Sequence, residues 1–310
     1  MGVFVYLPLV LPLTALPIAR LAEQHLHPRS ATRLLAAVGT TLALCSTVCL
    51  ALLMVVGTAQ LPGNPLPDGW SDPEVRAAVP YEEKAGIVAI GVLAAVVVAC
   101  GAAVHHHVRQ RVRAARALRS LPEQPSALAV LPDPEPYAYA LPGSPGRVVV
   151  STAMMECLTA RERRALVAHE RAHLTARHHR CLLATQLAAR ANPFLLPLRT
   201  AVAYSTERWA DEAAAQETGD RRAVAGAVGK AALFAHRSPD ALPALAAVGP
   251  IPRRVAALLD PVPPTRLWPP SSAHVALAGL VATAGTTVSA LSSLNATVTL
   301  VRILHAATPL

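Results

Sequence analysis

Long apolar stretches are the feature that most restricts how this chain of 310 residues can fold. An apolar stretch of about 20 residues can cross a hydrocarbon core of about 30 Å as a helix. The chain is 53% hydrophobic and only 4% aromatic, which is too apolar for an ordinary soluble domain. The sequence therefore predicts a mainly α, polytopic membrane protein with about four transmembrane helices. The predicted spans are residues 2–19, 34–59, 85–104 and 273–294.

The first of these stretches differs from the other three because it carries Pro8, Pro12 and Pro17. It has no basic N-terminal region and no convincing small-residue cleavage site. We therefore interpret it as an uncleaved span rather than a signal peptide.

The charges between the predicted spans indicate their orientation. Arginines dominate the segment between the first two spans and residues 105–119 after the third, whereas acidic residues dominate segment 60–84. Arginine-rich loops remain in the cytoplasm. The sequence therefore predicts a multi-pass protein of the cell membrane, with both termini outside. The long region between the third and fourth spans is predicted to be cytoplasmic.

This long region contains His169-Glu170-Arg-Ala-His173, an H-E-x-x-H motif. Four residues are slightly more than one helical turn, so the two imidazoles project from the same helix face. Two neutral imidazoles can occupy two corners of a tetrahedral zinc site. Glu170, beside them, is placed to accept a proton from a water at the metal.

The residues around the motif predict a well-defined helix. Thr159 and Glu162 have the spacing of a capping box, which indicates a helix over residues 160–176. The alternative interpretation of the motif is a pair of surface histidines and an exposed glutamate on an arginine-rich helix.

Glu207 and Asp211 follow one helix–turn–helix downstream. Glu207 offers a carboxylate oxygen as a third zinc ligand and leaves the fourth position for water. Asp211 lies one turn later on the same face, where it can accept the spare ring N–H of a ligating histidine. The alternative is a solvated acidic helix face shared with Glu212 and Glu217.

The combined pattern H-E-x-x-H followed by Glu207-x-x-x-Asp211 resembles the gluzincin peptidases of the M48 and M56 type. These include HtpX/Ste24-like membrane proteases and BlaR1/MecR1-like antibiotic-response proteases. The resemblance covers roughly residues 120–260. It includes segments 139–152 and 252–258, which flank the motifs. It implies a zincin-like α+β metallopeptidase domain with one Zn²⁺ per chain. The implied ligands are His169, His173 and Glu207, and the implied catalytic base is Glu170.

A zinc domain held between the third and fourth spans is similar to the M56 plan. That resemblance implies a BlaI/MecI-like repressor as a substrate, whereas the M48 resemblance implies membrane-protein segments. Only residues 296–310 follow the fourth predicted span, and no S-x-x-K sequence occurs. We therefore expect no C-terminal penicillin-binding sensor domain and no direct β-lactam sensing.

The basic segment after the third span predicts a helix at the membrane surface that is attracted to an anionic inner leaflet. Direct binding of nucleic acid is not expected, because aromatic residues and a recognisable reading motif are missing there. The predicted organisation is 1–104, three spans; 105–121, basic juxtamembrane helix; 122–260, zinc metallopeptidase domain; 261–272, Pro-rich linker; 273–295, fourth span; and 296–310, C-terminal tail.

Three further segments of the sequence complete the predictions. Residues 147–151 predict a strand, which by the family resemblance lies above the active-site helix and pairs with an extended substrate. Residues 182–202 predict either a buried helical hairpin or one that leans on the bilayer; their arginines argue against a fifth span. The candidate donors for stabilising an oxyanion are His236, Arg237, Arg253 and Arg254.

These patterns together predict a membrane-anchored zinc-dependent endopeptidase that cleaves cytoplasmic or membrane-associated proteins. A regulatory protease acting on a transcriptional repressor is one form of this prediction. The alternative is a non-catalytic regulatory scaffold with a structural or vestigial zinc site. Glu170 argues against the scaffold, because a structural zinc site needs no base.

Overall fold

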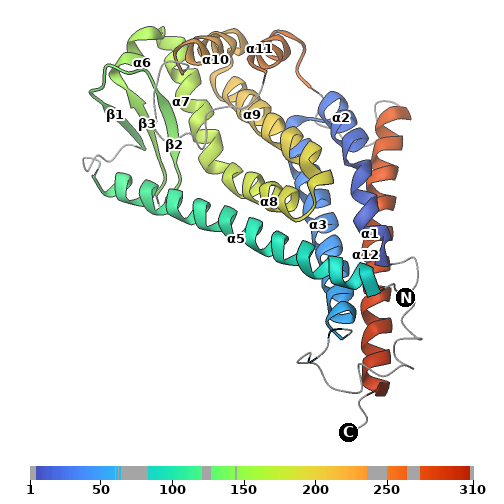
Figure 1. The fold of residues 1–310 in the computed structure, drawn as a ribbon. Helices are drawn as coiled ribbons and strands as arrows, with labels where there is room; N and C mark the ends of the chain where they lie inside the picture. Colours follow the sequence, from blue (N-terminus) through green and yellow to red (C-terminus); the bar gives the residue numbers. More distant parts are fainter. Residues whose placement is uncertain are drawn as a thin grey trace.

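The computed structural model describes residues 5–59, 61, 63, 83–120, 127–143, 145–235, 250–263 and 273–307. Long helices form one side of the molecule, and a small sheet with shorter helices lies at the far end of the longest helix (Figure 1). The prediction of a mainly α membrane protein is confirmed.

Within the described residues, three helices are long and apolar enough to cross a membrane. They match the second, third and fourth predicted spans. Several of their hydroxyl side chains bond to their own helix, as where Thr40 Oγ1 donates to the Ala36 carbonyl and Thr286 Oγ1 donates to the Ala282 carbonyl. The three helices are α3 (Pro28–Thr58), α5 (Glu83–Ser120) and α12 (Ala273–Ala307).

The first predicted span differs from the prediction of one continuous helix. It is divided into short helical segments, none of which alone reaches the length of a span. Proline lacks a backbone N–H and interrupts the i→i−4 ladder, which explains why the segments change at the prolines. The segments are α1 (Leu7–Val10), η2 (Leu11–Thr14) and α2 (Ala15–His25).

Two predicted boundaries also differ. The basic segment 105–121 is not a separate helix, because α5 continues without a break to Ser120. Likewise, α12 continues to Ala307, so most of the predicted tail is helical. Neither helix contains a proline, and the next prolines are Pro122 and Pro309. Without a breaker, a helix extends past the end of its apolar part.

The sheet consists of three strands in the order β1-β3-β2. β3 pairs with β1 in parallel and with β2 in antiparallel orientation. The predicted strand 147–151 is therefore confirmed as β3, but its predicted pairing with substrate is wrong, because both of its edges are occupied. The outer strands β1 and β2 each keep an unpaired edge among the described residues, and β2 lies within residues 121–146, whose prolines are typical of a connector. The strands are β1 (Leu128–Leu131), β2 (Ala138–Leu141) and β3 (Arg147–Ser151).

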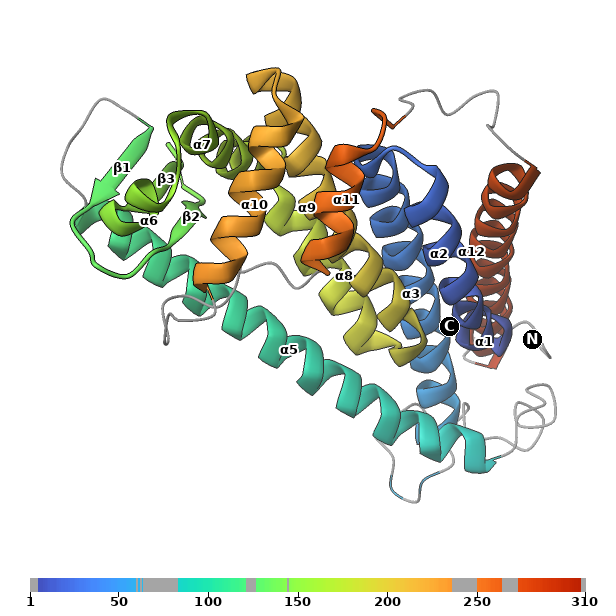
Figure 2. The same ribbon diagram turned by 90° about the horizontal axis from the view of Figure 1, so that it is seen from above.

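Two hydrophobic clusters hold together the elements between α5 and α12. One joins the sheet to α7, α9, α10 and α11, and the other joins α8, η4 and α9 to α2, α3 and α12. Figure 2 shows α10 and α11 side by side next to α9. The predicted hairpin 182–202 is present and packs against membrane helices. The elements are α6 (Thr152–Cys157), α7 (Ala160–Thr175), α8 (His178–Ala191), η4 (Pro193–Leu195), α9 (Leu196–Thr218), α10 (Arg221–Ala235) and α11 (Ile251–Leu259).

Candidate metal centre

α7 carries the H-E-x-x-H motif and begins where the sequence predicted. Thr159 and Glu162 form the capping box reciprocally: the Thr159 hydroxyl accepts from the Glu162 N–H, and the Glu162 carboxylate accepts from the Thr159 N–H. One turn apart on this helix, His169 and His173 bring their Nε2 atoms to 3.1 Å from one another.

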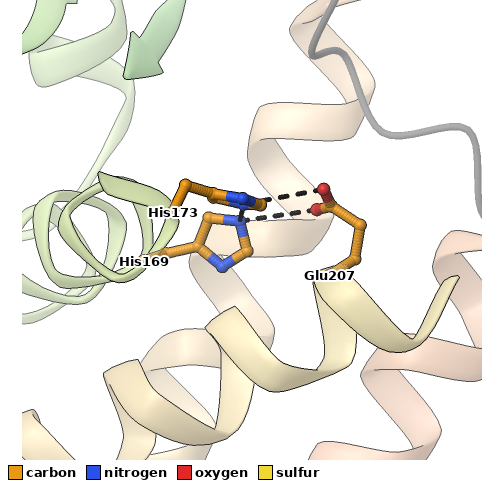
Figure 3. Close-up of side chains that lie close together, drawn as sticks. All are labelled: His169, His173 and Glu207. Atoms are coloured by element: carbon orange, nitrogen blue, oxygen red, sulfur yellow. Dashed lines mark hydrogen bonds and ion pairs between the residues drawn. The ribbon is translucent and has the colours of Figure 1, made fainter. Parts of the chain in front are cut away.

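Glu207 reaches the same point from α9, 34 positions further along the chain than His173. Its carboxylate oxygens lie 3.5 Å from His169 Nε2 and 3.5 Å from His173 Nε2 (Figure 3). With metal–ligand bonds of about 2.0–2.1 Å, the ligand atoms of a tetrahedral zinc site lie about 3.3 Å apart. One ligand atom from each residue lies within 4.8 Å of the other two, and the shortest contacts, 3.1–3.5 Å, are close to the spacing of such a site.

The outer nitrogens of the two histidines also have partners. His169 Nδ1 lies 3.1 Å from Asp211 Oδ1, and His173 Nδ1 lies 3.0 Å from His178 Nδ1. If each outer nitrogen carries the proton, both Nε2 atoms present lone pairs toward the Glu207 carboxylate. Three electron-pair donors then converge on one point, which is the chemistry of a cation site.

Burial decides between the two interpretations of the acidic residues on α9. Glu207 is 8% exposed and Asp211 is 0% exposed, so the alternative of a solvated face is wrong for both. Glu212 is buried too and pairs with Arg208 and Arg221. Burial alone would raise the pKa of Glu207, but the neighbouring histidines and Arg254 outweigh it and lower the pKa, which keeps the carboxylate ionised.

Arg254 was one of four candidate oxyanion donors, and the structure gives it a different role. Its Nε and Nη2 donate to Asp211 at 2.9 and 2.6 Å, and its Nη1 lies 3.0 Å from Glu207 Oε2. The guanidinium is buried and therefore fixes both carboxylates. Arg253 instead contacts Glu23 and the ring of Tyr204. The other two candidates, at 236 and 237, lie outside the described residues.

Glu170 lies beside the two histidines in a largely desolvated position. Burial raises the pKa of its carboxyl group, as a general base near neutrality requires. The backbone N–H of Ala140 donates to this carboxylate. Ala140 is on β2, and because Tyr137 bonds to Ser151 of β3, alternation along β2 directs Ala138 and Ala140 to the open edge. The open strand edge and Glu170 are thus neighbours.

His178 is a functional candidate that the sequence interpretation missed. The motif helix ends at Thr175, Arg177 has a left-handed backbone (φ 52°), and a new helix, α8, begins at His178. Burial and the adjacent His173 lower the pKa of His178 to about 3, so its neutral Nδ1 can accept a hydrogen bond from the Nδ1–H of His173. Its ring lies 4.6 Å from that of Trp209, over which Arg29 and Arg33 also lie.

The comparison with protein families agrees with this geometry. Residues 102–190 match the model of peptidase family M48, a range that includes the H-E-x-x-H motif and ends before Glu207. No curated protein and no solved structure gives a significant match to the chain. The match supports protease activity and a membrane-associated metallopeptidase in general.

Proposed function

We propose that this protein is a membrane-anchored zinc endopeptidase. The convergence of His169, His173 and Glu207, with Glu170 beside them, carries the proposal. The donor set of two imidazoles and one carboxylate fits Zn²⁺ in a catalytic rather than a structural site, because only three protein ligands are present in the group. Bound there, zinc would polarise a peptide carbonyl and acidify a water molecule.

The chain's own residues supply the remaining steps. Glu170 takes a proton from the attacking water and passes it to the leaving amine. Arg254 holds Asp211 and Glu207 in place, and Asp211 in turn orients His169. An extended substrate adds to the open edge of β2, where main-chain hydrogen bonds bind many sequences.

As substrates we propose cytoplasmic or membrane-associated protein segments that reach the inner membrane surface. The family match supports a peptidase of the M48 type and gives no support to the M56 type. A BlaI/MecI-like repressor is therefore only one of the candidate substrates to include in a screen. We further propose one Zn²⁺ per chain and a catalytic domain on the cytoplasmic side, next to the arginines at the start of α3.

Metal removal tests the proposed function directly. The purified protein in detergent should contain about one zinc per chain and cleave an unstructured reporter peptide. A chelator should abolish cleavage, and added Zn²⁺ should restore it. His169→Ala should lose the zinc, whereas His179→Ala should keep it. Zinc-loaded protein that cleaves no peptide would favour the scaffold alternative.

Replacing His178 with Phe should weaken zinc binding by about 10–100-fold, the usual effect of losing the partner of a ligating histidine. Phenylalanine keeps the packing on Trp209 but cannot accept a hydrogen bond from the ring N–H of His173. Competition with a zinc chelator measures the affinity, and His179→Phe is the matched control. Equal affinity in both variants would mean that His178 only packs.

The orientation can be tested independently of the chemistry. A phosphatase that is active only outside the cell should be inactive when fused at residue 150, which lies between α5 and α12. A cytoplasmic reporter fused there should be active. The expected result follows from the arginines that flank the spans. An active phosphatase at this position would overturn the cytoplasmic placement.

A further inference from the structure

The turn between α8 and α9 lies at the depth of the membrane helices. At the turn, Asn192 Nδ2 donates to Ser46 Oγ on α3 at 3.1 Å. Arg33 is the last charged residue on α3 before Ser46, which lies 13 positions further along the helix, a rise of about 20 Å. The turn therefore packs on α3 well inside its apolar part.

A second membrane helix also contacts the hairpin. Cys100 of α5 lies 3.8 Å from the carbonyl of Leu187, near the end of α8. Ala191 packs against a cluster formed by α3, α5 and α12, and Leu195 and Leu198 belong to the cluster shared with α2, α3 and α12. The end of the hairpin is thus part of the transmembrane bundle.

The turn leaves no backbone donor for water to satisfy. Pro193 and Pro197 have no N–H. The N–H of Phe194 donates to Asn192 Oδ1, that of Leu195 to the Asn192 carbonyl, and that of Leu196 to the Pro193 carbonyl. A turn in hydrocarbon has to bond its N–H groups internally, and this turn meets that condition.

The outward face of the turn is apolar. Phe194 is 51% exposed and Leu196 is 50% exposed. The nearest charged residues, Arg190 and Arg199, are exposed on either side of the turn, and their long side chains can extend toward lipid headgroups. A face of this kind, continuous with three membrane helices, fits acyl chains.

We propose that the α8–η4–α9 hairpin is a re-entrant membrane element whose turn, residues 193–196, is inserted among lipid acyl chains. Phe194 and Leu196 contact the lipid, and the Asn192–Ser46 hydrogen bond attaches the turn to α3. Because α9 is continuous from Leu196 to Thr218, Glu207 lies about 16 Å along the helix from the inserted turn, 11 residues away, near the level of Arg29 and Arg33. The candidate metal centre is thereby held at the membrane surface.

Spin labelling of the full chain in lipid nanodiscs tests this proposal without requiring peptidase activity. A nitroxide is attached to Phe194→Cys in a background whose five native cysteines are replaced. Collisions with oxygen, which partitions into lipid, are compared with collisions with a water-soluble nickel chelate. The lipid reference is Val98→Cys on α5 and the water reference is Leu233→Cys on α10. The two native side chains are similarly exposed, at 71% and 73%.

The label at Phe194 should resemble that at Val98, with frequent oxygen collisions and few nickel collisions. Nickel accessibility equal to that at Leu233 would place the turn in water and overturn the proposal. Low accessibility to both reagents would mean that protein, such as a second copy of the chain, covers the turn, and would overturn it as well. Because cleavage is not measured, neither result bears on the proposed peptidase activity.

Discussion

Glu170→Gln should retain zinc and lose peptide cleavage. The amide has the size of the carboxyl group but cannot accept a proton, and general acid–base catalysis contributes about 10²–10⁴ in rate. We therefore expect kcat to fall by at least about 100-fold while zinc content stays near one per chain. Zinc analysis and reporter cleavage on the same preparation measure the two quantities.

The matched control is Glu217→Gln, which changes an exposed glutamate paired with Arg171 on the outer side of α7. This variant should retain wild-type cleavage. The pH profile adds a second readout: burial raises the pKa of Glu170, so wild-type activity should be lost, as the pH falls, at a value above the usual range of a glutamate. Undiminished cleavage by Glu170→Gln would refute the assignment of the base.

Arg254→Met should destabilise the metal-free protein by about 3–5 kcal/mol, because removing one partner of a buried ion pair leaves uncompensated charge. Here two buried carboxylates, Glu207 and Asp211, would lose their common cation. Bound Zn²⁺ supplies positive charge at Glu207, so the loss should be smaller with zinc. Denaturant unfolding in detergent, with and without zinc, measures the difference.

Arg253→Met provides the neighbouring control. The Arg253 side chain is half exposed and pairs with Glu23, and such surface pairs contribute about 0–1 kcal/mol. Equal destabilisation by the two substitutions would contradict the role given to Arg254. The wild-type ion pair also has a defined pH dependence: burial alone would raise the pKa of Asp211, but Arg254 lowers it, so the stabilisation is present at neutral pH and lost as the pH falls through that lowered pKa.

Local patterns in the sequence predicted much of the fold. The membrane helices and α7 depend on residues within one or two turns of each other, such as the capping box of Thr159 and Glu162, and on continuous apolar composition. The segment that failed this rule is the first predicted span, where prolines interrupt an otherwise apolar stretch. Its hydropathy resembled that of a span, but its prolines prevent one uninterrupted series of i→i−4 backbone hydrogen bonds.

The sheet was harder to predict because strand pairing is not local. β3 was evident from its consecutive valines, but which outer strand lies beside Glu170 depends on where β1 and β2 pair with it. β2 lies between prolines and has little β-branched character, so its sequence indicated a connector. Only the pairing of Ala138–Leu141 with β3 shows that β2 faces Glu170.

The sequence by itself predicted which side chains could carry the chemistry, because His169 and His173 at this spacing share one helix face, and Glu207 and Asp211 share one face of α9. Only the tertiary structure decided what surrounds them. Arg254 reaches the carboxylates from α11, His178 turns back onto His173 at a break between helices, and the α8–α9 turn packs at the level of Ser46. These contacts join residues whose relative positions depend on how the helices pack, and no local spacing encodes that packing.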